Sequence, residues 1–198
     1  MLGSARPGFT PREPIEDDVS LRTQVHQSLF AALLLCPLAS LAGAPAPARG
    51  VDSAFFIARS ENRNQVHYGV HVGEDCSPQG PHPVHAYWRM LEQGTAKTEP
   101  LLRIEGPAYG LEDTQEVASS PAGWRIRIRL RAYSDRPIEI ALARENGACT
   151  TRAWMVLNGS LSQLEQIYVR TQWPIGVDYI RLSGVTPDGR AVTELIRP

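Results

Sequence analysis

Hydrophobic and polar positions alternate in short segments after residue 50, and turn-forming residues separate the segments at intervals of about eight to twelve positions. Successive side chains of a β-strand point to opposite faces, so this alternation predicts strands that are buried on one side. Segments with the helical period are nearly absent from this part of the chain. The predicted strands cover residues 54–59, 65–72, 84–91, 101–105, 124–133, 138–145, 149–157, 164–171, 177–185 and 190–196.

Residue pairs that favour tight hairpins lie between several of these segments. Asn146-Gly147 and Asp188-Gly189 favour positive φ angles at both central positions of a type I′ turn. Asn158-Gly159 is a third such pair, and we expect residues 160–163 to lengthen its loop. The chain is therefore predicted to be all-β, an antiparallel meander of about ten strands. We favour closure of the meander as a β-barrel, with a β-sandwich as the alternative.

The first 48 residues follow a different pattern. Residues 29–44, LFAALLLCPLASLAGA, are uncharged and are followed by a proline-rich segment, which is typical of a helical signal peptide. This run is shorter than the ~20 residues of a membrane-spanning helix, so we expect no stable membrane span after cleavage. We predict a signal peptide with an N-terminal extension in 1–48 and a single all-β domain in 49–198, exported to the periplasm or the extracellular space.

The charge balance argues against one class of partner. Of 20 basic and 21 acidic residues, the first 48 contain three arginines and four acids, which leaves 17 of each sign in 49–198. Nucleic-acid binding proteins usually carry a net positive charge or a basic stripe. We therefore expect no nucleic-acid partner.

Cysteine usage agrees with export. Cys36 lies within the predicted signal peptide, which leaves Cys76 and Cys149 as a single pair. Disulfides form and persist in exported proteins. We predict a disulfide between Cys76 and Cys149.

Four arginines alternate with apolar residues in the segment GWRIRIRLRAY, residues 123–133. The apolar set must face the core, so the arginines face the other way. Glu139 and the acids of residues 112–116 could neutralise them across neighbouring strands. We interpret the row as a solvated, internally paired strand face, with an anion-binding groove as the alternative. The four candidate residues are Arg125, Arg127, Arg129 and Arg131.

No motif in the chain indicates catalysis, a metal or a cofactor. His67 and His71 share a strand face but lie about 13 Å apart, too far to hold one metal ion. The sequence has no nucleophile elbow, phosphate-binding glycine loop or dinucleotide fingerprint. We therefore assign no catalytic residue, no metal site and no cofactor.

Residues 55–68 (FFIARSENRNQVHY) and 87–92 (YWRMLE) are similar to a bacterial exported family catalogued as domain of unknown function 4833. The resemblance continues through residues 108–110 and the closing Gly184, residues 188–190 and Glu194. The family name records no assigned activity, so the resemblance implies no catalytic residues.

The first of these motifs reads as a hairpin with a polar connection over residues 60–64. Asparagines in such a connection hydrogen-bond to their own turn, which is a structural role. The functional alternative is a polar and aromatic patch formed with the second motif. Its candidate ligand-binding residues are Asn62, Asn64, His67, Tyr87, Trp88, Arg89 and Glu92.

These observations favour an exported, non-catalytic binding or accessory protein of the cell envelope. Its partner is expected to be a small molecule or another envelope component. One alternative is an envelope hydrolase that uses His67 or His71 with a nearby carboxylate. Another is a structural or interaction protein, which would expose a large apolar patch.

Overall fold

A computed structural model describes residues 49–92, 97–172 and 176–197. These residues form one compact unit. The predicted signal peptide lies outside the described residues. No helix in the described ranges is long and apolar enough to cross a membrane.

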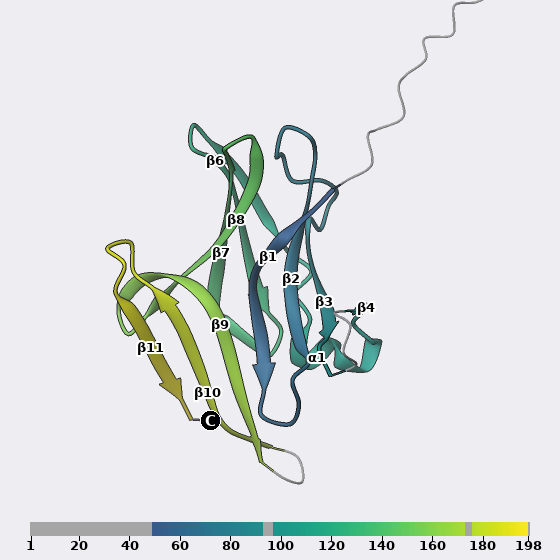
Figure 1. Ribbon diagram of the computed structural model, residues 1–198, viewed down its shortest axis with the longest axis vertical. Coiled ribbons are helices and arrows are strands. Elements are labelled where there is room, and N and C mark those ends of the chain that lie inside the picture. The colour runs from purple at the N-terminus through teal and green to yellow at the C-terminus, as the bar shows by residue number, and fades with distance from the viewer. Residues whose placement is uncertain (1–48, 93–96, 173–175, 198) are drawn as a thin grey trace, which may run out of the picture. The chain divides into compact units, whose positions relative to one another are not determined.

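The described residues form an all-β structure with one 3₁₀ helix, η1, and one short α-helix, α1 (Figure 1). The elements are β1 (Arg49–Arg59), β2 (Gln65–Val72), β3 (Val84–Met90), β4 (Lys97–Pro100), η1 (Arg103–Glu105), α1 (Gly106–Tyr109), β5 (Glu116–Ser120), β6 (Gly123–Leu130), β7 (Tyr133–Glu145), β8 (Ala148–Leu157), β9 (Ser160–Gln172), β10 (Gly176–Val185) and β11 (Ala191–Ile196).

All but one of the predicted strands are present. The prediction for residues 101–105 was wrong, because that segment leads into η1 and then into α1, where Pro107 occupies the first turn. Proline is tolerated there because the first turn of a helix leaves its N–H groups without intrahelical partners. The strands β4 and β5 were missed because they are short edge strands with mostly exposed residues and no apolar alternation.

The antiparallel meander is confirmed for the second half of the chain, since each strand from β5 to β11 pairs with the next in antiparallel fashion. The strands β1 to β4 form a second antiparallel run. The long strand β9 joins the two runs. One edge of β9 pairs with β8 near its start and with β1, in parallel, over Gln166–Val169, and its other edge pairs with β10.

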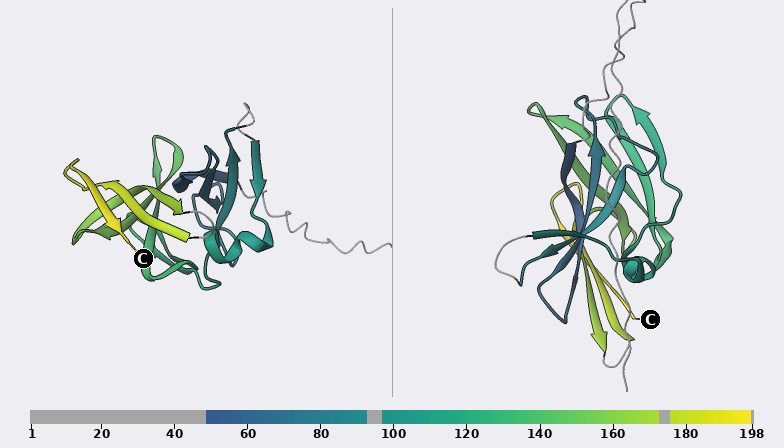
Figure 2. Two further views of the ribbon diagram at one scale, coloured as in Figure 1. Left: turned by 90° about the horizontal axis from the view of Figure 1, so that it is seen from below. Right: turned by 90° about the vertical axis from the view of Figure 1, so that its right-hand side faces the viewer.

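The predicted barrel is wrong. The hydrogen-bonded path runs β4-β3-β2-β1-β9-β8-β7-β6-β5, and its two end strands do not pair with each other. Because β8 and β1 share one edge of β9, the strands diverge there into two facing layers, β1–β4 and β5–β8 (Figures 1 and 2). The arrangement is open and sandwich-like, close to the alternative fold.

Both layers contribute to one hydrophobic core. Phe55 and Tyr68 come from the first layer and stack with their ring centroids 4.4 Å apart, and Ile126 and Ile140 come from the second. The predicted disulfide between Cys76 and Cys149 is confirmed, and it ties the β2–β3 connection to the start of β8.

The hairpin turns follow the expected chemistry in part. Asn146 and Gly147 both have positive φ, 51° and 80°, as a type I′ turn requires. Asn158 and Gly159 do the same, but β9 begins directly at Ser160, so the expected longer loop was wrong. In the third pair only Gly189 has positive φ. The Thr186 N–H donates to the carbonyl of Arg190, which makes this loop longer than a type I′ turn.

Candidate functional site

A charged side chain occupies an inward register position of β1. Phe55 and Ile57 are buried in the core, and Arg59, two residues further, continues the same face of the strand. The Arg59 guanidinium carbon lies 4.9 Å from the ring centroid of Trp88, which β3 presents to the same side. Trp88 is buried, so the core ends in a cation stacked on an aromatic ring.

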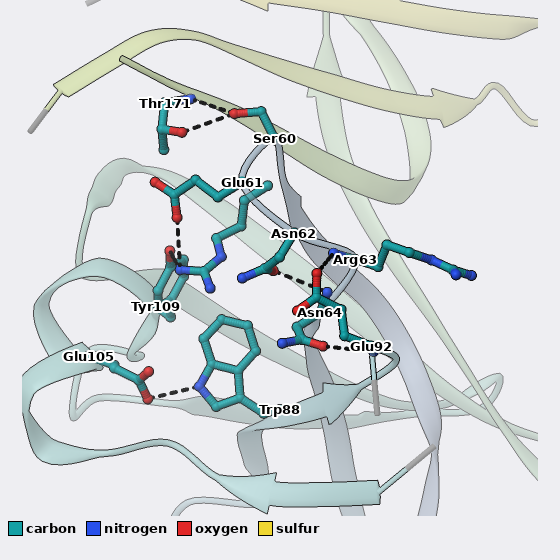
Figure 3. A network of polar contacts seen from close by, with 11 residues as sticks. Ser60, Glu61, Asn62, Arg63, Asn64, Trp88, Glu92, Glu105, Tyr109 and Thr171 are labelled. Atoms are coloured by element: carbon teal, nitrogen blue, oxygen red, sulfur yellow. Dashed lines mark hydrogen bonds and ion pairs between the residues drawn. The ribbon is translucent and has the colours of Figure 1, made fainter. Parts of the chain in front are cut away.

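The η1–α1 segment is held beside Trp88 by hydrogen bonds and ring packing (Figure 3). Trp88 Nε1 donates to Glu105 Oε2 over 2.8 Å, and the Leu102 N–H donates to the same oxygen over 2.8 Å. Tyr109 packs edge-on against Trp88 with ring centroids 5.5 Å apart. The hydroxyl of Tyr68 also donates to the carbonyl of Tyr109 over 2.7 Å. The segment therefore holds Trp88 in a fixed orientation.

The guanidinium of Arg59 has only long hydrogen-bond and ion-pair contacts among the described residues. Its Nη1 lies 3.5 Å from the Tyr109 hydroxyl and 3.5 Å from Glu61 Oε2, both at the long limit of such contacts. Its Nε is buried and has no hydrogen-bond partner among the described residues. A buried donor without a partner costs about 1–3 kcal/mol. The guanidinium can therefore accept a further partner with a gain in free energy.

A cavity of about 490 Å³ opens beside Arg59 and Trp88. Its lining residues are Arg59, Asn64, Trp88, Met90, Lys97, Thr98, Glu99, Pro100, Leu102 and Glu105. Lys97 Nζ donates to Glu99 Oε1 over 2.9 Å, and this hydrogen bond raises the pKa of Lys97. The second cation of the wall therefore has a close carboxylate partner, whereas Glu61, the carboxylate that faces Arg59 among the described residues, lies 3.5 Å away.

Asn62 and Asn64 have the structural role expected of a polar hairpin connection. Asn62 Oδ1 accepts the Asn64 N–H over 3.1 Å, and Asn64 Oδ1 accepts the N–H groups of Leu91 and Glu92 at 3.0 and 3.2 Å. A carboxylate oxygen of Glu92 accepts the Arg63 N–H over 3.2 Å (Figure 3). These bonds tie the β1–β2 turn to the end of β3, and Asn64 also lines the cavity.

The structure divides the predicted patch between two faces of one layer. Trp88 and Asn64 lie on the cavity side, whereas Tyr87 and Arg89, adjacent to Trp88 in β3, point the opposite way. His67 lies with them on the outer face, where it stacks on Tyr87 at 5.8 Å between ring centroids. The seven candidates therefore do not form one site.

Sequence reasoning missed Arg59 and Glu105, which line the cavity, and Tyr109, which packs on Trp88. A signal for Arg59 was present, because a charged residue follows Phe55 and Ile57 at the inward register. Glu105 had no comparable signal, since residues 101–105 were predicted to be a strand, and Tyr109 entered only through the resemblance over residues 108–110.

His67 is buried between Phe56 and Tyr87, and its Nε2 forms a 2.9 Å hydrogen bond with Gln65 Oε1. Burial, with a smaller contribution from the positive charge of Arg89, lowers the pKa of His67 to about 4. The ring is therefore neutral at neutral pH.

We expect His67 to make stability depend on pH. Between pH 6.5 and 4 the unfolded chain binds a proton at this position and the folded chain does not. The contribution of His67 to the free energy of unfolding is therefore fully present above pH 6.5 and is lost as the pH falls toward 4. The loss by pH 5 should be about 1–2 kcal/mol, allowing for partial solvent contact. Urea unfolding at pH 7.5 and 5 should show a smaller loss in His67→Gln than in the wild type. The exposed His82→Gln is the control, and equal losses in the wild type and His67→Gln would contradict this role.

The first three arginines of the row lie on the solvent side of β6, opposite the buried Ile126, Ile128 and Leu130, and Arg131 lies in the turn that follows. Three members of the row face carboxylates: Arg125 lies 3.1 Å from Glu139, Arg127 lies 3.1 Å from Glu116, and Arg131 lies 2.7 Å from Asp113. A cavity of about 350 Å³ lies beside Arg125 and Arg127 on this outer face. Anion binding by this row stays a prediction.

Residues 55–195 match the model of a family described as a domain of unknown function, DUF4833. The chain belongs to this family. The DUF4833 match includes both motifs that carried the resemblance, and these motifs supply Arg59, Asn64, Trp88 and Met90 to the cavity. No curated protein and no solved structure matches the chain.

Proposed function

We propose that this DUF4833 protein is an exported, non-catalytic binding module of the cell envelope that takes a small molecule into the cavity beside Arg59 and Trp88. The observation that carries the proposal is the weakly satisfied guanidinium of Arg59 at the wall of an open cavity. A site that keeps a donor unmet in the empty state gains that hydrogen bond when a ligand enters.

The surroundings of the histidines favour binding over hydrolysis. A general base needs a proton affinity matched to the working pH, and the lowered pKa of His67 makes it a weak base. Its hydrogen-bond partner is the amide of Gln65 rather than a carboxylate. His71 stacks on His85 with ring centroids 3.9 Å apart. Neither arrangement resembles the His–carboxylate pair that a hydrolase of this kind would use.

Two observations support export. The first is the uncharged run of residues 29–44, which is typical of a signal peptide. The second is the Cys76–Cys149 disulfide, a bond that persists in oxidising compartments.

Native mass spectrometry of the protein purified from its own host tests the proposal. We expect a bound small molecule in the wild type and its loss in Met90→Trp, because Met90 lines the cavity and an indole there fills it. The control is Val117→Trp, which adds the same ring on the exposed edge strand β5. Thermal melting of both variants checks that they fold. Absence of a bound molecule from the wild type, or equal retention in the two folded variants, would refute the proposal.

A further inference from the structure

We infer that the ligand of this cavity is an amphiphile with a carboxylate head group, held by Arg59, and an apolar body that packs on Trp88, Met90 and Leu102. This inference rests on the proposed binding function and adds the chemical class of the ligand. It follows from the unmet Nε donor of Arg59, from the apolar walls of the cavity and from the exposed Leu102 at its edge.

The head group is assigned from the guanidinium. A guanidinium presents pairs of parallel N–H donors that match the two oxygens of a carboxylate. The described contacts of Arg59 both fall on Nη1, and Nε has no partner. Arg59 lines the cavity, and because its guanidinium stacks on Trp88, a ligand reaches its N–H donors at the edge of the guanidinium plane.

The other charges of the site are consistent with an anion. Lys97 has a carboxylate partner in Glu99 at 2.9 Å, and Glu105 accepts hydrogen bonds from Trp88 and Leu102. Glu61 is the resident counter-ion of Arg59, at 3.5 Å and with a side chain that is 52% exposed. A long contact to an exposed carboxylate is worth at most about 1 kcal/mol, so a ligand carboxylate can replace it.

The apolar body is assigned from the walls and the rim. Trp88, Met90, Pro100 and Leu102 line the cavity. Leu102 is 63% exposed, and Ile104, two residues further along the same turn, is 85% exposed. An apolar chain that leaves the cavity over Leu102 would cover surface that folding leaves in water, at a gain of about 25 cal/mol per Å².

Isothermal titration calorimetry with four probes of known chemistry tests the inference. The probes are decanoate, decanol, decylamine and acetate, each below its aggregation concentration. We expect decanoate to bind about tenfold tighter than decanol, because a charge-assisted pair replaces one neutral hydrogen bond. Decylamine should bind most weakly of the ten-carbon probes because its charge repels Arg59. Acetate should not bind measurably because it has no apolar body.

Three variants identify the group that binds the carboxylate. Arg59→Gln should weaken decanoate about tenfold and leave decanol nearly unchanged. Glu61→Gln should tighten decanoate about threefold because it removes the competing counter-ion. Arg63→Gln is the matched control, a cation of the same turn whose side chain points away from Trp88 (Figure 3), and it should change nothing.

Equal binding of decanol and decanoate, or an Arg59→Gln variant that binds decanoate as the wild type does, would overturn the inference. A fifth probe, decyl phosphate, tests the choice of a carboxylate, and tighter binding of decyl phosphate than of decanoate would overturn it. These failures are distinct from failure of the proposed function. A bound molecule that Met90→Trp excludes but that carries no anionic group leaves the binding function standing and removes only its ligand class.

Discussion

Loss of the Cys76–Cys149 disulfide should lower the free energy of unfolding by about 4 kcal/mol. The bond joins residues 73 positions apart, and a loop of that length restricts the unfolded chain strongly. It also links the β2–β3 connection to β8, and these two elements belong to opposite layers. Urea unfolding of the double variant Cys76→Ser/Cys149→Ser, compared with the oxidised wild type, measures the loss. The expected decrease in melting temperature is about 10 °C.

Reduction of the wild type provides the control for this measurement. If the effect comes from the cross-link and not from the serine side chains, the reduced wild type and the double variant should unfold at the same urea concentration. A double variant as stable as the oxidised protein would show that the two layers need no covalent link.

The strands could be predicted from the sequence because each has one buried and one exposed face. In β6 the alternation of Ile126 and Ile128 with Arg125 and Arg127 determines both the strand and the direction of its side chains. The edge strands β4 and β5 carry no such pattern, because most of their residues are exposed. Their pairing depends on the neighbouring strands β3 and β6.

The arrangement of the strands was harder to predict than their existence. Hairpin turns allowed antiparallel neighbours to be predicted, since the turn at Asn146-Gly147 joins the antiparallel strands β7 and β8 directly. The parallel pairing of β1 with β9 brings Ile57 next to Ile167, and no turn or local motif connects residues so distant in the chain. This one contact decides between a barrel and two facing layers.

In the candidate site, too, contacts within one turn could be predicted from the sequence, whereas contacts between segments distant in the chain could not. The turn bonds of Asn62 and Asn64 were predictable, because an asparagine in a tight connection bonds to nearby backbone. The environment of Arg59 was not, because Trp88 comes from a different strand and Tyr109 from a helix that folds back over the layer. Because successive side chains of a strand point to opposite sides, Tyr87 and Trp88 lie on different faces of the sheet although they are adjacent in one motif.

A small substitution next to β9, the strand that joins the two antiparallel runs, should also have a large effect on the free energy of unfolding. Gly184 lies in β10 beside a register shift of the β9–β10 pairing, and its main chain passes close to Gln163. A Cβ atom at this position would lie 2.3 Å from the Gln163 carbonyl oxygen and 3.2 Å from Leu157 Cδ1. The carbonyl belongs to the backbone of β9 and cannot move away without disturbing the strand that joins the two layers.

Gly184→Ala should therefore lower the free energy of unfolding by about 3 kcal/mol, the upper part of the range for overpacked sites. Gly176→Ala is the matched control in the same strand, because its Cβ would lie 3.7 Å from the nearest atom, the carbonyl oxygen of Gln172. That change should be neutral or stabilise the protein by up to about 1 kcal/mol, since alanine restricts the unfolded chain. Urea unfolding of both variants measures the difference. Equal stability would mean that β9 shifts to admit the methyl group, so that its register is adjustable where the layers meet.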